Sequence, residues 1–283
     1  MIAWGDYQTG SCRVCCPICG RGERDKTLGV TIEREGHGIA HCFRCDFTES
    51  YRTKRGVTIG TGAKSVQMPV QTRLYEELSD YGRALWSETK PLSGVAVAYL
   101  KARNCCIPPV DGDLRFHPSL KHPSGYVGPA LVALITDAVT GRPLSIHRTW
   151  IQRDGRKAEV EHPRLLLGKH RKQGGVIRLW PDETVTYGLG IAEGIETALS
   201  LAWGFAPVWS CIDAGNLAAF PYLPGIESIV IAADNDPAGK VAAQTCAVRW
   251  ADAGADVVVT RQLENDLNDT LKEALCKNKR ELS

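Results

Sequence analysis

The sequence predicts an α/β protein in three parts: a small cysteine-rich module, a basic α+β middle subdomain and a C-terminal parallel sheet flanked by helices. Three observations predict it: cysteine pairs within residues 12–45, alternating β-rich and helical runs after residue 185, and segregated charge. Residues 65–180 contain 17 Lys and Arg against 10 Asp and Glu, whereas residues 181–283 contain 7 against 15. The net charges of +7 and −8 favour a polyanion on the middle segment and cations at the end, although two separate solvated faces are the simpler alternative.

The composition is that of a globular protein with a sizeable core. The chain has 283 residues, 43% of them hydrophobic, and no apolar run approaches the roughly 18 residues that cross a membrane. The first ten residues lack the basic start and apolar stretch of a signal peptide, so we expect a cytoplasmic protein. Eleven cysteines there indicate bound metal or free thiols, not disulfides.

Two Cys-x-x-Cys pairs, Cys16 with Cys19 and Cys42 with Cys45, are separated by 22 residues. This spacing is typical of a zinc ribbon, in which four thiolates surround one structural Zn²⁺. We expect the ribbon to occupy residues 1–49, with strands at 28–32 and 38–41 that turn at 35–36. Zinc would supply on the order of 10 kcal/mol of folding free energy to so small a module.

The first pair has an alternative, because Cys12 and Cys15 show the same spacing. A proline and a glycine beside the chosen pair favour it, since both suit a tight turn. His41 could replace one ligand, but it is better explained as facing solvent or nucleic acid. Phe43 is then available to stack on a base.

A segment rich in Thr, Gly, Lys and Ser, residues 50–70, predicts a linker to the middle subdomain, residues 71–180. Within that subdomain, the apolar spacing predicts two helices in 74–103, and an antiparallel strand pair is expected at 130–136 and 144–151.

Residues 142–178 hold ten Lys or Arg against three acids, a composition that suits single-stranded nucleic acid or a triphosphate. The candidate contacts are Arg148, Arg164, Lys169, Arg171 and Lys172. A solvated basic loop is the alternative.

The C-terminal segment, residues 181–283, alternates predicted strands (185–192, 208–212, 228–233 and 256–260) with predicted helices (195–203 and 237–252). This alternation indicates a parallel sheet with helices on its faces, in which functional sites lie at the carboxyl ends of strands. Acids follow three of these strands: Glu193, Asp234 with Asp236, and Asp266 with Asp269. We expect them to converge.

Converging carboxylates with few basic neighbours favour hard divalent cations, Mg²⁺ or Mn²⁺. Gly194 and Gly239 are then positions where the backbone approaches an ion or a phosphate closely. The alternative for Asp236 is a helix cap before Pro237.

The motifs Ala192-Glu-Gly-Ile-Glu-Thr-Ala-Leu199 and Ala233-Asp-Asn-Asp-Pro-Ala-Gly239 resemble the Toprim domain of primases, topoisomerases and some nucleases. Together with a zinc ribbon that ends His-Cys-Phe-Arg-Cys, the order resembles Toprim-domain DNA primases of the bacterial, phage and plasmid type. The resemblance covers most of the chain but is weak from 65 to 180.

This resemblance implies that Glu193 is the acid/base glutamate, that Asp234 and Asp236 bind metal, and that Asp266 belongs to the last acidic motif. The four acids would bind Mg²⁺ or Mn²⁺ and carry catalysis. One departure is Thr197, which stands where bacterial primases commonly place Asp. Glu196 either substitutes for that Asp or stabilises the first turn of its helix.

The expected function is therefore synthesis of short RNA primers on single-stranded DNA from ribonucleoside triphosphates, with a separate replicative helicase as partner. Two other classes stay open: a non-catalytic zinc/Toprim DNA-binding scaffold and a metal-dependent Toprim nuclease.

Overall fold

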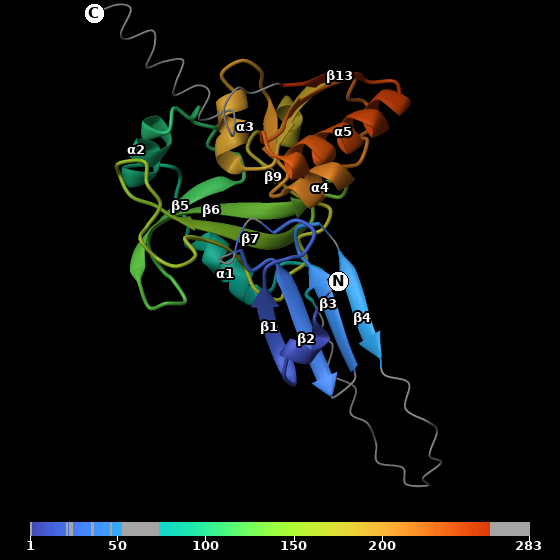
Figure 1. Cartoon of the computed structure of the whole chain (residues 1–283). Helices are drawn as coiled ribbons and strands as arrows, with labels where there is room; N and C mark the ends of the chain where they lie inside the picture. Colours follow the sequence, from blue (N-terminus) through green and yellow to red (C-terminus); the bar gives the residue numbers. More distant parts are fainter. Residues whose placement is uncertain are drawn as a thin grey trace, which may run out of the picture. The chain divides into compact units, whose positions relative to one another are not determined.

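The computed structural model describes residues 2–260 except for 21, 23, 24, 35, 36, 46 and 53–73. The chain divides into two compact units, Met1–Pro69 and Val70–Ser283, and each is treated separately (Figure 1). No helix among the described residues is long and apolar enough to cross a membrane.

The first unit is an antiparallel sheet in the order β1-β2-β3-β4. Its elements are η1 (Trp4–Asp6), β1 (Gly10–Val14), β2 (Leu28–Arg34), β3 (His37–Cys42) and β4 (Thr48–Arg52). Alternate residues of β2, namely Leu28, Val30 and Ile32, are buried in a small core. The predicted hairpin corresponds to β2 and β3. The sequence analysis missed β1, because four of its five residues are exposed and give no alternating pattern.

The second unit contains one large mixed sheet in the order β13-β12-β10-β11-β9-β6-β7-β8, with β5 paired to β6. Its strands are β5 (Leu114–Lys121), β6 (Val127–Asp137), β7 (Pro143–Trp150), β8 (Arg164–Leu166), β9 (Gly175–Arg178), β10 (Gly188–Ala192), β11 (Val208–Ser210), β12 (Ser228–Ala232) and β13 (Asp256–Val259). The strands β10 to β13 pair in parallel, as predicted. This C-terminal sheet and the α+β middle confirm the predicted fold class.

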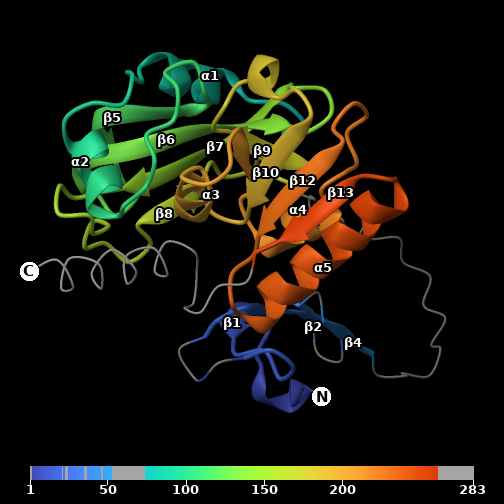
Figure 2. The ribbon, with the colours of Figure 1, turned by 90° about the horizontal axis from the view of Figure 1, so that it is seen from above.

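Helices cover both faces of this sheet: α1 (Asp80–Ser87), α2 (Val95–Ala102), α3 (Ile195–Leu201), η2 (Asp182–Thr184), α4 (Ala214–Ala219) and α5 (Pro237–Asp252). In β10, Leu189 and Ile191 pack in the core that contains α4 and α5, whereas Ala192 packs in the core of α2 and α3. Figure 2 shows α5 along β12 and β13. The other face of β6 carries Val132 and Leu134 into a third core beneath α1.

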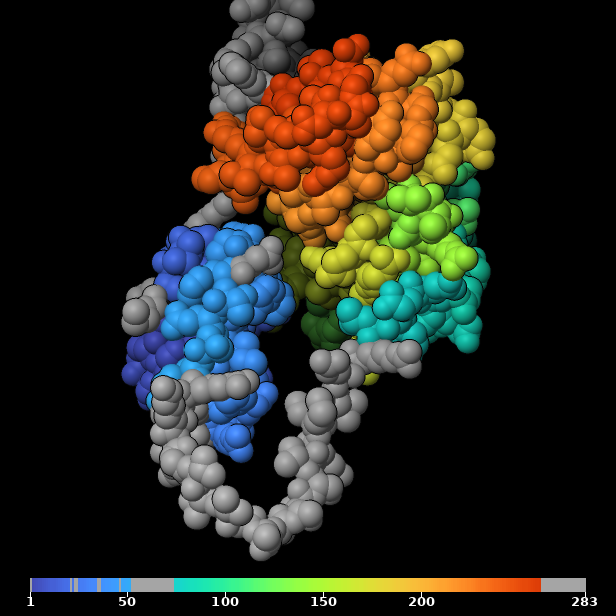
Figure 3. Space-filling view, turned by 90° about the vertical axis from the view of Figure 1, so that its right-hand side faces the viewer, coloured from blue at the N-terminus to red at the C-terminus, as the bar shows by residue number. Residues whose placement is uncertain are grey.

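The middle and C-terminal segments share this sheet through β9. That strand pairs antiparallel with β6 on one side and with β11 on the other. Seen in space-filling form, the segments of the second unit make one continuous surface (Figure 3). The division between the middle and C-terminal segments after residue 180 stays a prediction. Backbone hydrogen bonds between β9 and β11 join the two segments.

Candidate active site

The Sγ atoms of the four predicted zinc ligands, Cys16, Cys19, Cys42 and Cys45, all lie within 4.8 Å of one another. The Sγ atoms of Cys16 and Cys45 are 3.7 Å apart, and those of Cys19 and Cys42 are 3.5 Å apart. Sulfurs arranged as a tetrahedron around zinc, each about 2.3 Å from the ion, are about 3.8 Å from one another. The donor set therefore fits a structural zinc ion.

Backbone N–H groups donate hydrogen bonds to two of these four sulfurs. The N–H groups of Ile18 and Arg44 donate to the Sγ atoms of Cys16 and Cys42, each over 3.4 Å. Burial raises the pKa of the Cys42 thiol, but the N–H groups of Arg44 and Cys45 outweigh it and lower this pKa to about 6. Thiolates are the form that binds zinc, so this geometry favours binding.

The alternative pair, Cys12 and Cys15, lies outside the four-sulfur group. Cys12 is exposed on β1, and the Cys15 thiol contacts the carbonyl oxygen of Cys16 at 3.8 Å. A β-carbon at Gly20 would collide with the Cys15 sulfur, so the turn beside Cys16 requires glycine.

Phe43 lies on the surface of the first unit with 60% of its side chain exposed. The guanidinium of Arg13 lies 4.5 Å from the centroid of its ring, and the His41 ring meets it edge-on at 5.0 Å. His41 is thus beside Phe43 and not among the four sulfurs. An exposed aromatic ring beside a cation suits base stacking, which stays a prediction.

Acidic side chains from three parallel strands meet in one cavity of the second unit. Glu193 follows β10, Asp213 follows β11 and Asp234 follows β12, and the pairing of these strands places their carboxyl ends at one edge of the sheet. The cavity, called the acidic cavity below, encloses about 340 Å³ and is lined by His147, Arg164, Leu165, Leu166, Glu193, Gly194, Ile212, Asp213 and Asp234.

The Glu193 carboxyl is the electrostatic centre of this cavity. Its Oε1 atom is buried and has no hydrogen-bond partner among the described residues. Burial, followed by the negative charges of Asp234, Asp236 and Asp213, raises the pKa of Glu193 from 4.5 to about 8. A carboxylate held among three others is a position that a divalent cation would stabilise strongly.

Asp236 is the N-cap of α5, because its Oδ1 atom accepts a hydrogen bond of 2.8 Å from the N–H of Gly239, and Pro237 begins the helix. The predicted helix cap is therefore present and uses one carboxylate oxygen of Asp236. The negative charge of Asp236 nevertheless contributes to the raised pKa of Glu193. A β-carbon at Gly239 would lie 2.6 Å from the Asp234 carbonyl oxygen and 2.8 Å from Glu193 Oε1. Glycine is needed there. At Gly194 a β-carbon would meet only Thr197 Oγ1, at 3.7 Å, so packing does not demand glycine.

Thr197, not Glu196, faces the acids. The Thr197 hydroxyl lies 3.5 Å from Asp234 Oδ1. Glu196 points into the protein, where it accepts a 2.8 Å hydrogen bond from the Tyr99 hydroxyl and lies 3.5 Å from Lys157 Nζ. Burial would raise the pKa of Glu196, but Lys157 and Arg164 lower it to about 2. Glu196 therefore connects α3 to the middle subdomain and does not substitute for the missing Asp.

Two predicted nucleic-acid contacts, Arg148 and Arg164, lie in different environments. Arg164, on β8, is exposed and lines the acidic cavity, and its guanidinium forms no hydrogen bond or ion pair with another described residue. Arg148, on β7, is only 8% exposed, donates a 2.9 Å hydrogen bond to the Leu166 carbonyl oxygen and lies over the Trp150 ring. We therefore leave Arg148 out of the proposed site.

The other three predicted contacts lie on the loop between β8 and β9. Lys172 Nζ donates a 2.6 Å hydrogen bond to Asp213 at the cavity, and Arg171 pairs with Asp137 at 3.0 Å. Lys169 is exposed and adopts a left-handed backbone conformation with φ of 63°. Only Lys172 of these three thus reaches the acidic cavity.

The sequence analysis missed two cavity residues, Asp213 and His147. Asp213 directly follows a predicted strand, 208–212, so the rule that identified Glu193 could have identified it. His147 lies on the face of β7 opposite Arg148, and burial lowers its pKa to about 4. No residue in the described part of the chain forms a hydrogen bond with its Nδ1 atom. A neutral imidazole therefore faces the acids.

The residues at the acidic cavity fit a divalent cation. Carboxylates are the ligands that Mg²⁺ and Mn²⁺ prefer, and Glu193 has a buried oxygen to which no described residue donates a hydrogen bond. Asp266 and Asp269 lie outside the described residues.

Two family comparisons match this chain. Residues 188–276 match the Toprim domain family, and residues 76–179 match a domain of unknown function, DUF7146. The resemblance of the C-terminal segment to the Toprim domain is thereby confirmed. No curated protein sequence matches the chain.

Three solved structures align with this chain at low sequence identity. The primase fragment of the bacteriophage T7 primase-helicase protein is 17% identical with a TM-score of 0.43, over 95% of this chain and 97% of that one. The Aquifex aeolicus primase, with its zinc-binding and RNA polymerase domains, is 15% identical with a TM-score of 0.46, over 99% and 81%. A DNA primase domain from Pseudomonas aeruginosa is 15% identical with a TM-score of 0.43, over 69% and 74%.

Proposed function

We propose that this chain is a DNA primase that synthesises short RNA primers on single-stranded DNA by metal-dependent nucleotidyl transfer. The observation that carries the proposal is the meeting of Glu193, Asp213 and Asp234 at one strand edge, opposite the cationic Arg164. Acids gathered for a divalent cation, with a cation free to hold phosphate beside them, form a site suited to phosphoryl transfer. The Toprim match over the same segment supports this chemistry.

The proposed metal ligands are Glu193, Asp234, Asp236 and, outside the described residues, Asp266. Magnesium or manganese bound there would neutralise the triphosphate and stabilise the attacking and leaving oxygens of an in-line displacement. Glu193 is placed to accept the proton of the attacking 3′-hydroxyl, because its buried Oε1 atom has no hydrogen-bond partner among the described residues. A bound divalent cation would lower the raised pKa of this carboxyl and keep it ionised, the form that accepts a proton.

The cations around the acidic cavity would hold the template strand. Arg164 has no ion pair to another described residue, so its charge is available to a phosphate, whereas Lys172 would have to exchange Asp213 for one. Lys169 and Arg171 extend this basic loop. The zinc ribbon, with Phe43 exposed, is proposed to grip or read the template, and a separate helicase would deliver it.

A primer assay tests the proposal. Purified protein is incubated with ribonucleoside triphosphates, Mg²⁺ or Mn²⁺ and mixed single-stranded templates, and labelled oligomers are resolved by length. We expect short oligomers that are lost in Asp234→Asn and retained in Asp252→Asn, a matched change of an exposed acid at the far end of α5. Absence of any oligomer under both metals would contradict the proposal.

Two further readouts identify the rival functions. DNA binding that is unchanged in Asp234→Asn, without polymerisation by either protein, would indicate a scaffold. Nicking of plasmid DNA in Mg²⁺, abolished by Asp234→Asn, would indicate a nuclease.

A further inference from the structure

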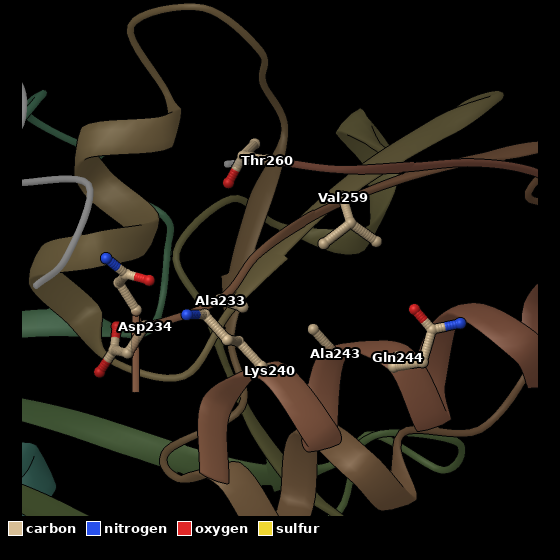
Figure 4. Close-up of a pocket in the computed structure, with 8 residues that line it drawn as sticks. Ala233, Asp234, Lys240, Ala243, Gln244, Val259 and Thr260 are labelled. Atoms are coloured by element: carbon tan, nitrogen blue, oxygen red, sulfur yellow. The ribbon is translucent and has the colours of Figure 1, made fainter. Parts of the chain in front are cut away.

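A second cavity adjoins the acidic cavity at Asp234, which lines both. It lies between α5 and the ends of β12 and β13, on the side of Asp234 away from β10, and encloses about 350 Å³ (Figure 4). We call it the α5 cavity. It is lined by Ala233, Asp234, Asn235, Lys240, Ala243, Gln244, Val259 and Thr260.

Polar groups without partners converge on the α5 cavity. Lys240 extends from the start of α5 toward the loop of Asp234 (Figure 4), and its ammonium forms no hydrogen bond or ion pair with another described residue. Gln244 follows one turn later on the same helix. Just after β13, the Thr260 hydroxyl oxygen is buried and has no hydrogen-bond partner within residues 2–260 that the structure describes. No described residue forms a hydrogen bond or ion pair with the Lys240 ammonium or a hydrogen bond with the Thr260 hydroxyl.

An ammonium, an amide and a hydroxyl around a shared carboxylate suit a metal-complexed polyphosphate. Lysine binds phosphate as a point charge, and the first turn of the 16-residue helix α5 adds partial positive charge. Asp234 alone would repel an anion, so the ligand must arrive with the divalent cation that Asp234 is proposed to bind. A free carboxylate ligand or a bare phosphate fits less well.

In an in-line displacement, the attacking group and the leaving group lie on opposite sides of the reacting phosphorus. The acidic cavity, with Glu193 and Arg164, suits the attacking strand, and the α5 cavity lies on the opposite side of Asp234. We propose that the α5 cavity binds the triphosphate tail of the incoming nucleotide, with Lys240 and Gln244 as ligands. This inference rests on the proposed function.

Each bond that forms or breaks in this reaction can then be assigned to one of the two cavities. The 3′-oxygen forms a bond to the α-phosphorus, and the hydroxyl proton goes to Glu193. The bond between the α-phosphorus and the bridging oxygen breaks, and its electron pair leaves with pyrophosphate in the α5 cavity beside Lys240.

The test measures the affinity of the full chain for inorganic triphosphate in Mg²⁺ by calorimetry. Lys240→Ala is expected to weaken binding roughly tenfold or more, the usual effect of losing a hydrogen bond to a charged group. Gln244→Glu should weaken it similarly, because the new carboxylate lies in the cavity and pairs with Lys240 at i,i−4. The matched control is Thr245→Glu, which adds the same charge one residue along. Thr245 does not line the α5 cavity and lies in a neighbouring groove that Gln244 also borders; we expect less than a twofold change.

Affinity for single-stranded DNA is measured in parallel and should stay unchanged in all three variants. The inference is overturned if Lys240→Ala and Gln244→Glu bind triphosphate as the wild type does, or if they weaken DNA binding as much. It is also overturned if only Lys240→Ala has an effect, because Lys240 then merely offsets the charge of Asp234.

The outcome is separable from that of the primer assay. A wild type that binds triphosphate through Lys240 and Gln244 but synthesises no oligomer would overturn the proposed function and leave the cavity assigned. If instead the wild type makes primers and Lys240→Ala has an unchanged KM for nucleotide, the proposed function stands and the assignment of the α5 cavity is overturned.

Discussion

Replacing Glu193 with Gln should make the metal-free protein more stable at alkaline pH. The pKa of Glu193 is raised from 4.5 to about 8 in the folded protein, so between these values the folded state holds a proton that the unfolded state has lost. Stability therefore decreases as pH rises from 4.5 to 8. The whole shift corresponds to on the order of 4 kcal/mol, which we discount to about 2–3 kcal/mol because water reaches part of the carboxyl.

Gln has nearly the same shape and does not ionise, so Glu193→Gln escapes this loss. We expect the variant and the wild type to be about equally stable at pH 4, and the variant to be about 2–3 kcal/mol more stable at pH 8.5. Urea unfolding is followed by tryptophan fluorescence, since all of the seven tryptophans except Trp4 belong to the second unit. The buffer contains neither Mg²⁺ nor chelator, so that the ribbon keeps its zinc.

The control is Glu183→Gln, a matched change at an exposed glutamate of η2, which should reproduce the wild-type profile. Saturating Mg²⁺ should close the gap at pH 8.5 by stabilising the wild type more than Glu193→Gln. Identical pH profiles for the wild type and Glu193→Gln, or a gap that Mg²⁺ leaves unchanged, would refute the account of Glu193 as a carboxyl crowded by other acids.

Three other changes test the ribbon, the buried glutamate and the two arginines. Cys45→Ser should lower bound zinc from one ion per chain to near zero, by metal analysis after gel filtration, and leave the second unit folded. Glu196→Gln should cost about 3 kcal/mol of unfolding free energy at pH 7, since it leaves the half-buried Lys157 without its charge partner. The loss should shrink as pH falls below 4.5 toward 2, where wild-type Glu196 becomes protonated. An equal loss at every pH would contradict this. Arg164→Ala should weaken binding of single-stranded DNA and reduce its salt dependence by about one phosphate contact. It should cost some stability, because Arg164 also helps to lower the pKa of Glu196. Arg148→Ala should lower stability more and spare DNA binding, and salt titrations with urea unfolding separate the two variants.

The sequence predicted best where a local pattern also determines the position in space. The closeness of Glu193 and Asp234 could be predicted because residues that follow neighbouring parallel strands lie at the same edge of the sheet. The four ribbon cysteines could be grouped because metal ligands come in fixed spacings.

Prediction failed where tertiary contacts decide the role of a residue. The alternation in β7 placed Arg148 and His147 on opposite faces, but only the folded sheet reveals which face meets the acids. The inward direction of Glu196 depends on Tyr99 and Lys157, both distant in sequence. The strand β9, only four residues long, gives too short a pattern to be recognised.

The position of β9 has a practical consequence for dissecting this protein. Because β9 hydrogen-bonds to β6 on one flank and β11 on the other, a fragment that starts after residue 180 would leave β11 as a bare edge strand. Such edges invite pairing between molecules. A recombinant Toprim fragment is therefore expected to aggregate unless its start is moved upstream to retain Gly175–Arg178, and even then the β6 flank would need a partner.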